Sequence, residues 1–212
     1  MAMESPIGKK MMHHGLRNSL LSPKHSFLTT YILQEEENTK ESYFWPFIDI
    51  LPKTFENFPI FFTDEEKKEL EGSPFLKQVE EKIEDVRNDY ENICDKVPEY
   101  AKYDFKRFSE IRMMVSSRIF GMNIEGTKTD GFVPMADMLN HKRPKQTTWS
   151  YIDEKGGFVI EALHDIPRNE EVFDSYGKKC NSRFFLNYGF IVRNNDANEV
   201  PIEIYYNPGD KL

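Results

Sequence analysis

The side chains that could do chemistry in this sequence are concentrated in its last third. Residues 137–141, Asp-Met-Leu-Asn-His, place a carboxylate, an amide and an imidazole within five positions. A short β-type run, residues 171–175, follows about thirty positions later and leads into Tyr176. Tyr188 and Phe190 stand 12 and 14 residues after Tyr176, beyond one short predicted helix. Each piece is common by itself, so the signal lies in their order and spacing.

In that order, the three pieces resemble the C-terminal half of a SET domain, the fold of S-adenosylmethionine-dependent protein methyltransferases. Within this family, the chain is similar to the branch of the Rubisco large-subunit lysine methyltransferases and their eukaryotic relatives. Residues 42–52 resemble the serine-aromatic-proline-leucine-proline stretch in the helical insert of that branch, and residues 116–120 resemble the arginine motif that closes the insert. The resemblance covers nearly the whole chain and is specific from Ser116 to Phe190.

The resemblance implies a role for each of the residues that match the family's motifs. Tyr176 corresponds to the tyrosine whose hydroxyl lies beside the transferred methyl group, so it is the predicted catalytic residue. Tyr188 is predicted to bind the acceptor amine of the substrate. The residues predicted to bind S-adenosylmethionine are Arg118, Asp137, Asn140, His141 and Phe190. No metal is expected to take part.

Methyl transfer from a sulfonium to an amine is an in-line displacement, so the protein has chiefly to position two reactants and exclude water. A lysine acceptor must be neutral to attack, although its free pKa is about 10.4. An apolar aromatic channel lowers that pKa because it desolvates the charged form. Tyr176, Tyr188 and Phe190 could line such a channel. The predicted function is therefore S-adenosylmethionine-dependent methylation of a lysine side chain of a protein substrate.

Two alternative functions stay open at this point. One branch of the family methylates histidine, although Phe120, two residues after Arg118, and Tyr188 favour a lysine-type pocket. The other alternative is a non-catalytic SET-like interaction protein. The family begins with a β-rich segment whose glycine-x-glycine turn contacts the cofactor, whereas Gly8 and Gly15 are isolated here. We therefore expect the chain to be a fragment, or a truncated member, that keeps the helical insert and the C-terminal SET half.

Composition excludes several other classes of protein. The 212 residues, 39% hydrophobic and 14% aromatic, are those of a folded globular protein. A formal net charge of −8 argues against direct nucleic-acid binding and would favour a basic protein partner. Two cysteines cannot form a four-cysteine zinc site. No apolar run approaches the length of a membrane span, and the N-terminus has no apolar run of a secretory signal. A cytoplasmic or nuclear location is expected.

The predicted fold class is α+β, with a helical insert packed on a β-rich SET-C region. We expect an N-terminal segment over residues 1–19, the insert over 20–125, the SET-C region with the cofactor and acceptor site over 126–193, and a last strand with the start of a truncated C-terminal region over 194–212. The resemblance implies that the C-terminal segment threads through a loop near Asn140 in a knot-like arrangement.

Local signals predict the individual elements. Helices are expected to begin after Ser22, Thr63 and Ser73, where an N-cap residue precedes proline or acidic residues. Apolar residues at alternating steps of three and four between Leu76 and Val97 favour one helix packed in a bundle, with a homodimer through this helix as the alternative. A further helix is predicted over residues 104–122. The predicted strands are 132–139, 147–152, 158–163, 171–175 and 200–206, with a short helix over 181–187.

Overall fold

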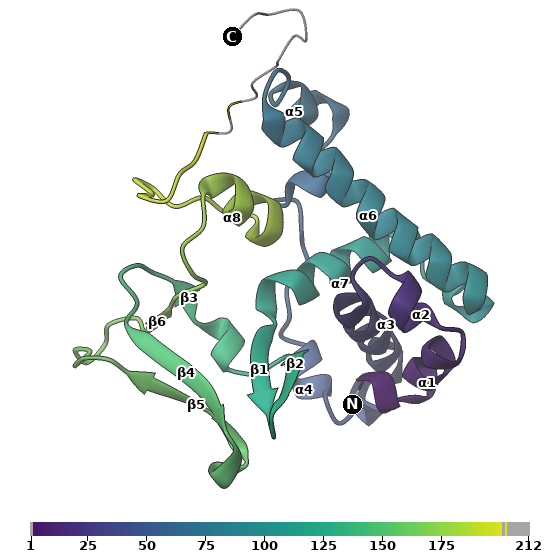
Figure 1. Ribbon diagram of the computed structural model, residues 1–212, viewed down its shortest axis with the longest axis horizontal. Coiled ribbons are helices and arrows are strands. Elements are labelled where there is room, and N and C mark those ends of the chain that lie inside the picture. The colour runs from purple at the N-terminus through teal and green to yellow at the C-terminus, as the bar shows by residue number, and fades with distance from the viewer. Residues whose placement is uncertain (1, 201, 203–212) are drawn as a thin grey trace, which may run out of the picture.

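The structure, a computed structural model, describes residues 2–200 and residue 202. Helices occupy the first half of the chain and short strands most of the second (Figure 1). The α-helices are α1 (Pro6–His13), α2 (Leu16–Ser19), α3 (Pro23–Asn38), α4 (Trp45–Ile48), α5 (Asp64–Lys68), α6 (Pro74–Lys96), α7 (Phe105–Arg118) and α8 (Asn181–Tyr188). The strands are β1 (Phe120–Ile124), β2 (Thr127–Gly131), β3 (Asn140–His141), β4 (Thr147–Ile152), β5 (Gly157–Ala162) and β6 (Phe173–Asp174). The predicted α+β class is confirmed.

The helical half is held together by an apolar core between α3, α6 and α7. Phe27, Ile93 and Phe108 are fully buried in it, one from each of these helices. Burying an aromatic or aliphatic side chain of this size contributes roughly 1.5–3 kcal/mol relative to leaving it exposed. The core of the helical half therefore depends on long-range contacts between helices that are far apart in the sequence.

The predicted helix starts after Ser22, Thr63 and Ser73 are confirmed, and at Thr63 and Ser73 a side-chain hydrogen bond caps the helix. Thr63 and Glu66 form a reciprocal capping box, with the Thr63 N–H donating to Glu66 at 2.8 Å and the Glu66 N–H donating to Thr63 at 3.2 Å. Ser73 accepts from the Phe75 N–H at 3.2 Å, and proline follows at the first helical position. Pro98 begins a 3₁₀ turn directly after α6, as expected for a residue that lacks an N–H.

Residues 1–19 contain two helices that the sequence did not predict. Ile7, Met11 and Leu16, from α1 and α2, are buried in the same core as α3. Helices of this length are marginal by themselves, so tertiary packing supplies most of their stability. The short segment shows no apolar repeat long enough to be recognised from sequence.

The predicted helix over residues 104–122 is wrong in its last four residues. Helix α7 ends at Arg118, and β1 then pairs antiparallel with β2, from Phe120 opposite Gly131 to Ile124 opposite Thr127. Glu125 and Gly126 both have positive φ, 48° and 76°, as a two-residue hairpin turn requires. The expected boundary between residues 125 and 126 falls in this turn.

The predicted strand over residues 132–139 is also wrong. Met135 has a φ of 75°, and a 3₁₀ turn spans Ala136–Met138, so extended pairing begins only at Asn140. Strands β4 and β5 form an antiparallel hairpin, with Thr147 opposite Ala162, close to the predicted bounds. Strand β3 pairs in parallel with β6. The predicted last strand, residues 200–206, lies mostly outside the described residues, and the knot-like threading stays a prediction. Among the helices of the described residues, none has the length and apolarity to cross a membrane.

A partly buried histidine on α3, His25, makes stability depend on pH. Burial, followed by the charges of Arg112 and Lys82, lowers the pKa of His25 from 6.5 to about 4. At pH 7 the ring is neutral in the folded and the unfolded chain, but between pH 6.5 and pH 4 only the unfolded chain takes up the proton. Stability should therefore fall as the pH drops through this window.

Replacing His25 by glutamine is expected to reduce that loss of stability by about 1 kcal/mol between pH 7 and pH 5, allowing for the partly exposed ring. Thermal melts at the two pH values measure the difference, which corresponds to about 2–4 °C in a chain of this size. The exposed His164→Gln is the matched control. Equal pH dependence of the His25 variant and the unchanged protein would contradict the prediction.

Candidate active site

The parallel pair of β3 and β6 brings together the two segments that the sequence singled out. Asn140 lies opposite Phe173, and His141 lies opposite Asp174. Tyr176 stands two residues after the end of β6 and is held by two hydrogen bonds. Its backbone N–H donates to His141 Nδ1 at 3.0 Å, and its hydroxyl donates to the Leu139 carbonyl at 2.7 Å. The predicted proximity of Tyr176 to the Asn-His pair is therefore present in the fold.

The protonation states of His141 and Tyr176 follow from these bonds and from burial. Because Nδ1 accepts a hydrogen bond, the neutral His141 ring carries its proton on Nε2. Burial, with smaller effects from the charges of Lys179 and Arg143, lowers the pKa of His141 below its ordinary value. Burial raises the pKa of Tyr176 to about 12, so its hydroxyl is protonated at neutral pH. The site thus presents a neutral imidazole and a protonated phenol whose O–H is donated to the Leu139 carbonyl.

Helix α8 supplies an aromatic wall beside Tyr176. Tyr188 stacks on Tyr176 with ring centroids 5.1 Å apart and planes 20° apart. Phe190 stacks on Phe184 at 5.3 Å and lies 6.2 Å from the Tyr176 ring. Phe184 in turn lies 4.7 Å from His141 and is fully buried. Tyr176, Tyr188 and Phe190 therefore converge as predicted, and Phe184 joins them.

Sequence reasoning missed Phe184 as a member of this wall. It stands four residues before Tyr188 in a stretch that was predicted to be helical, and residues at that spacing share one face of a helix. That spacing was the signal that could have identified it.

Two asparagines position the segment that carries Tyr188 and Phe190. The Asn181 side chain donates to the Val192 carbonyl and accepts from the Val192 N–H, both at 3.0 Å, which fixes the loop after α8. Asn57, from the loop after α4, donates to the Gly189 carbonyl at 3.1 Å. Gly189 has a φ of 74°, and a side chain there would meet Asn57 at 2.4 Å, so glycine is required. The helical half thus contacts the site directly.

Arg118 and Asp137 form an ion pair next to this cluster, and the Arg118 side chain is partly exposed. Arg118 Nη1 lies 3.1 Å from Asp137 Oδ2 and also donates to the Asp137 carbonyl at 3.1 Å. The Asp137 side chain has no solvent exposure. Its second oxygen, Oδ1, is buried and accepts no hydrogen bond from any described residue. Burial raises the pKa of Asp137 even though Arg118 lowers it. The free oxygen is an acceptor for a cationic or N–H donor.

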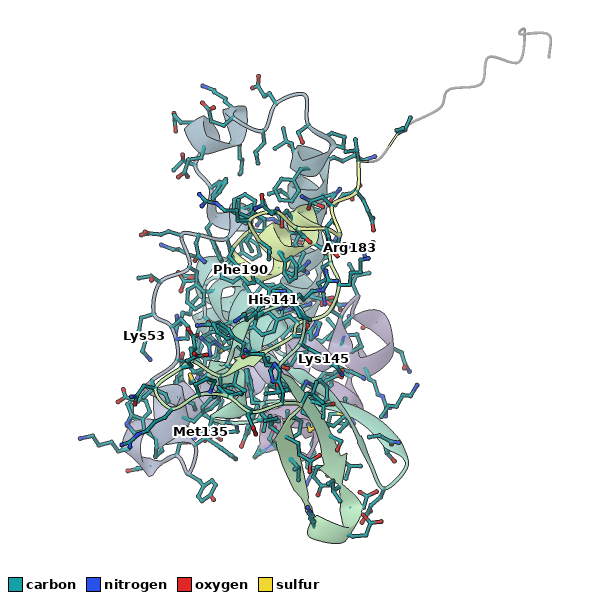
Figure 2. The ribbon with its side chains drawn as sticks, turned by 90° about the vertical axis from the view of Figure 1, so that its left-hand side faces the viewer. Lys53, Met135, His141, Lys145, Arg183 and Phe190 are labelled. Carbon is teal, nitrogen blue, oxygen red and sulfur yellow. The ribbon has the colours of Figure 1, made fainter. Side chains whose placement is uncertain are left out.

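Asn140 differs from the other predicted site residues because its side chain is exposed. Its amide donates to Glu171 Oε1 at 2.7 Å, which ties β3 to the segment before β6. In Figure 2, His141 and Phe190 lie close together at the centre of the view. The fold therefore brings the predicted residues into one region, with the Asn140 amide at its surface.

A cavity of about 720 Å³ lies outside this region, between the N-terminal turn, α3, α4 and the β1–β2 hairpin. Its lining includes Phe27, Tyr31, Phe47 and Ile124, and none of the predicted site residues. The cluster around Tyr176 is consequently distinct from this cavity. The described residues also contain no group of three or more histidine, cysteine or acidic side chains placed to hold a metal ion.

The fold and the cluster around Tyr176 define a SET domain. A family model of the SET domain matches residues 21–177, which is most of the chain. The chain belongs to the SET domain family. The resemblance seen in the sequence is thereby confirmed.

Solved structures show the same fold. The SET domain of LSMT bound to lysine and AdoHcy superimposes with a TM-score of 0.73 at 23% identity, over 91% of this chain and 45% of that chain. Rubisco LSMT bound to sinefungin and monomethyllysine gives a TM-score of 0.71 at 24% identity, over 91% of this chain and 43% of that chain. Both likenesses establish the shared fold.

Curated relatives include enzymes that act on different acceptors. The ribosomal lysine N-methyltransferase set10 of Schizosaccharomyces pombe is 25% identical over 190 residues, covering 87% of this chain and 34% of that protein. The actin-histidine N-methyltransferase of Homo sapiens is 24% identical over 217 residues, covering 92% of this chain and 36% of that protein. The chain spans about a third of the length of these relatives.

Proposed function

We propose that this protein is an S-adenosylmethionine-dependent methyltransferase that acts on a lysine side chain of a protein. Membership of the SET domain family supports the reaction class. The observation that carries the proposal is the convergence of Tyr176, Tyr188 and Phe190 beside a buried carboxylate with a free oxygen. This arrangement offers an aromatic surface for an acceptor side chain and a fixed negative group for a cationic ligand.

The residues of the site fit S-adenosylmethionine, and the clearest sign of that fit is the Asp137 carboxylate. Its Oδ1 has no hydrogen-bond donor among the described residues, and the ammonium of the cofactor's amino-acid end would supply one. Arg118 holds the opposite oxygen and keeps the carboxylate oriented. His141, Asn140 and Phe190 would hold the remainder of the cofactor. When bound, the cofactor supplies a methyl group on a sulfonium.

The acceptor side of the site depends on the aromatic residues. The stacked rings of Tyr176 and Tyr188 would replace water around the amine, which favours its neutral, nucleophilic form. The Tyr176 hydroxyl is protonated and positioned by Leu139, so it can orient an amine in the line of attack. Because the amine attacks in its neutral form, neither Tyr176 nor Tyr188 has to accept a proton in the methyl-transfer step.

Histidine is the second candidate acceptor, and it is favoured by one specific observation. Curated relatives include actin-histidine N-methyltransferases as well as a ribosomal lysine N-methyltransferase. We favour lysine because Tyr188 faces Tyr176. Phe120, which follows Arg118 at two residues and was expected to favour a lysine-type pocket, packs instead against Trp149 and Phe158 and does not support that choice. A non-catalytic SET-like interaction protein is the remaining alternative.

Two measurements test the proposal. Calorimetric titration of the chain with S-adenosylmethionine should show saturable binding, which Arg118→Met should weaken. Mass spectrometry of protein substrates after incubation with the cofactor should show methylated lysine, which can take up to three methyl groups. Methylation confined to histidine would select the second candidate. If the chain neither binds the cofactor nor methylates a protein, the non-catalytic interaction protein is the alternative that remains.

A homodimer through α6 and a cytoplasmic or nuclear location remain proposals as well. Val79, Val86 and Ile93 of α6 are buried within the chain, so a dimer would have to use other residues of this helix. Light scattering at several concentrations measures the assembly state. A concentration-independent monomer would argue against the dimer.

A further inference from the structure

The segments that build the candidate site differ in charge from the rest of the molecule. The whole chain carries a formal net charge of −8. Residues 138–152 and 175–193, which contain His141, Tyr176 and Tyr188, have no acidic residue. The basic residues in these two segments are Lys142, Arg143, Lys145, Lys178, Lys179, Arg183 and Arg193. Basic charge is therefore concentrated where the acceptor would bind.

The two basic segments come together around the aromatic cluster. The charges of Lys179 and Arg143 both act on His141, and the charge of Arg183 acts on Lys179. In Figure 2, Arg183 and Lys145 are labelled to the right of His141 and Phe190, with Arg183 above His141 and Lys145 below it. Lys145 and Arg183 are exposed, so their charged groups are available to a partner. We call these exposed residues, with Lys142, Lys178 and Arg193, the basic rim.

Several acidic side chains near the rim are engaged or buried, whereas Glu199, whose charge acts on Cys180, is exposed. Asp174 is 3% exposed, and Asp137 pairs with Arg118. Glu171 accepts from Asn140 at 2.7 Å, and Asp196 pairs with Arg143 at 2.5 Å. Among the described residues, none of the five members of the basic rim has a carboxylate within ion-pair distance. The charges of the rim are consequently not ion-paired, and Asp196, which lies near Lys178, compensates them only in part.

We propose that the basic rim binds an acidic segment of the protein substrate, next to the residue that enters the aromatic cluster. That the partner is a substrate rests on the proposed function. That the partner is acidic rests on the charge pattern alone. Complementary charge speeds encounter and rejects partners of the wrong sign. A long nucleic acid fits less well, because the acidic remainder of the molecule would repel a polyanion. The net charge alone predicted a basic partner, which is the opposite of what the rim would select.

The test compares two peptides that share one lysine, flanked by aspartate and glutamate in the first and by lysine and arginine in the second. Fluorescence anisotropy of labelled peptides, with the full chain and without cofactor, measures binding. We expect the acidic peptide to bind at least about tenfold more tightly at low salt, with the preference shrinking as salt screens the charges. The double variant Lys145→Glu/Arg183→Glu should weaken its binding at least about fivefold.

The matched control is Lys128→Glu/Lys155→Glu, which makes the same change of net charge at exposed residues on the two hairpins. It should leave peptide binding nearly unchanged, and thermal melts check that both variants are folded. Equal binding of the two peptides, equal weakening by the control, or tighter binding of a single-stranded oligonucleotide of equal charge would overturn the inference. A preference for the acidic peptide without methylation of any protein would instead remove only the proposed function.

Discussion

Tyr176→Phe is expected to lower the rate of methyl transfer by on the order of a hundredfold or more. The substitution keeps the ring that stacks on Tyr188 and removes only the hydroxyl, which donates to the Leu139 carbonyl at 2.7 Å. That hydroxyl is the polar group of the aromatic cluster that we assign to the acceptor amine. Single-turnover kinetics with saturating cofactor measure the chemical step separately from binding.

The control for this substitution is Tyr43→Phe. Tyr43 is 89% exposed and lies in the helical half, so its hydroxyl should have no effect on the rate. Cofactor affinity and melting temperature should stay close to those of the unchanged protein in both variants. A near-normal rate for Tyr176→Phe would reassign the catalytic role to another residue.

Arg118→Met is expected to destabilise the fold by about 3 kcal/mol, because it leaves the Asp137 carboxylate buried without its counter-ion. In a chain of this size the loss corresponds to a fall in melting temperature of about 6–12 °C. The side chain of Asp137 has no solvent exposure, and Arg118 is the cation that pairs with it. Weaker binding of S-adenosylmethionine should accompany the loss of stability.

The pH dependence of this loss has a definite sign. Burial already raises the pKa of Asp137 above 3.8, and removal of Arg118 raises it further. The variant should therefore be most destabilised at neutral pH, and the difference should shrink as the pH falls and the carboxyl group becomes protonated. Asp137→Asn in the same chain should restore most of the stability, since it removes the unpaired charge. Additive losses in the double variant would contradict this account of the ion pair.

Local signals were enough to predict many of the elements. The capping box at Thr63, the Ser73-Pro74 start of α6 and the alternation in Thr147–Ile152 each depend on residues close together in the chain. The errors arose where distant contacts decide the conformation. The helix predicted to residue 122 ends at Arg118, because residues 120–124 pair with β2.

The sequence by itself predicted the candidate site residues, because their types, order and spacing match a family. It could not give the relations between them. The hydrogen bond from Tyr176 to His141 joins residues 35 positions apart, and it exists because β3 and β6 run in parallel. The tertiary structure likewise decided that Asp137 is buried with one free oxygen and that Phe184 joins the wall. Net charge is a property of the sequence, but its concentration around the site required the fold, since the pairing of β3 with β6 joins the segments that lead into residues 142–145 and 178–183.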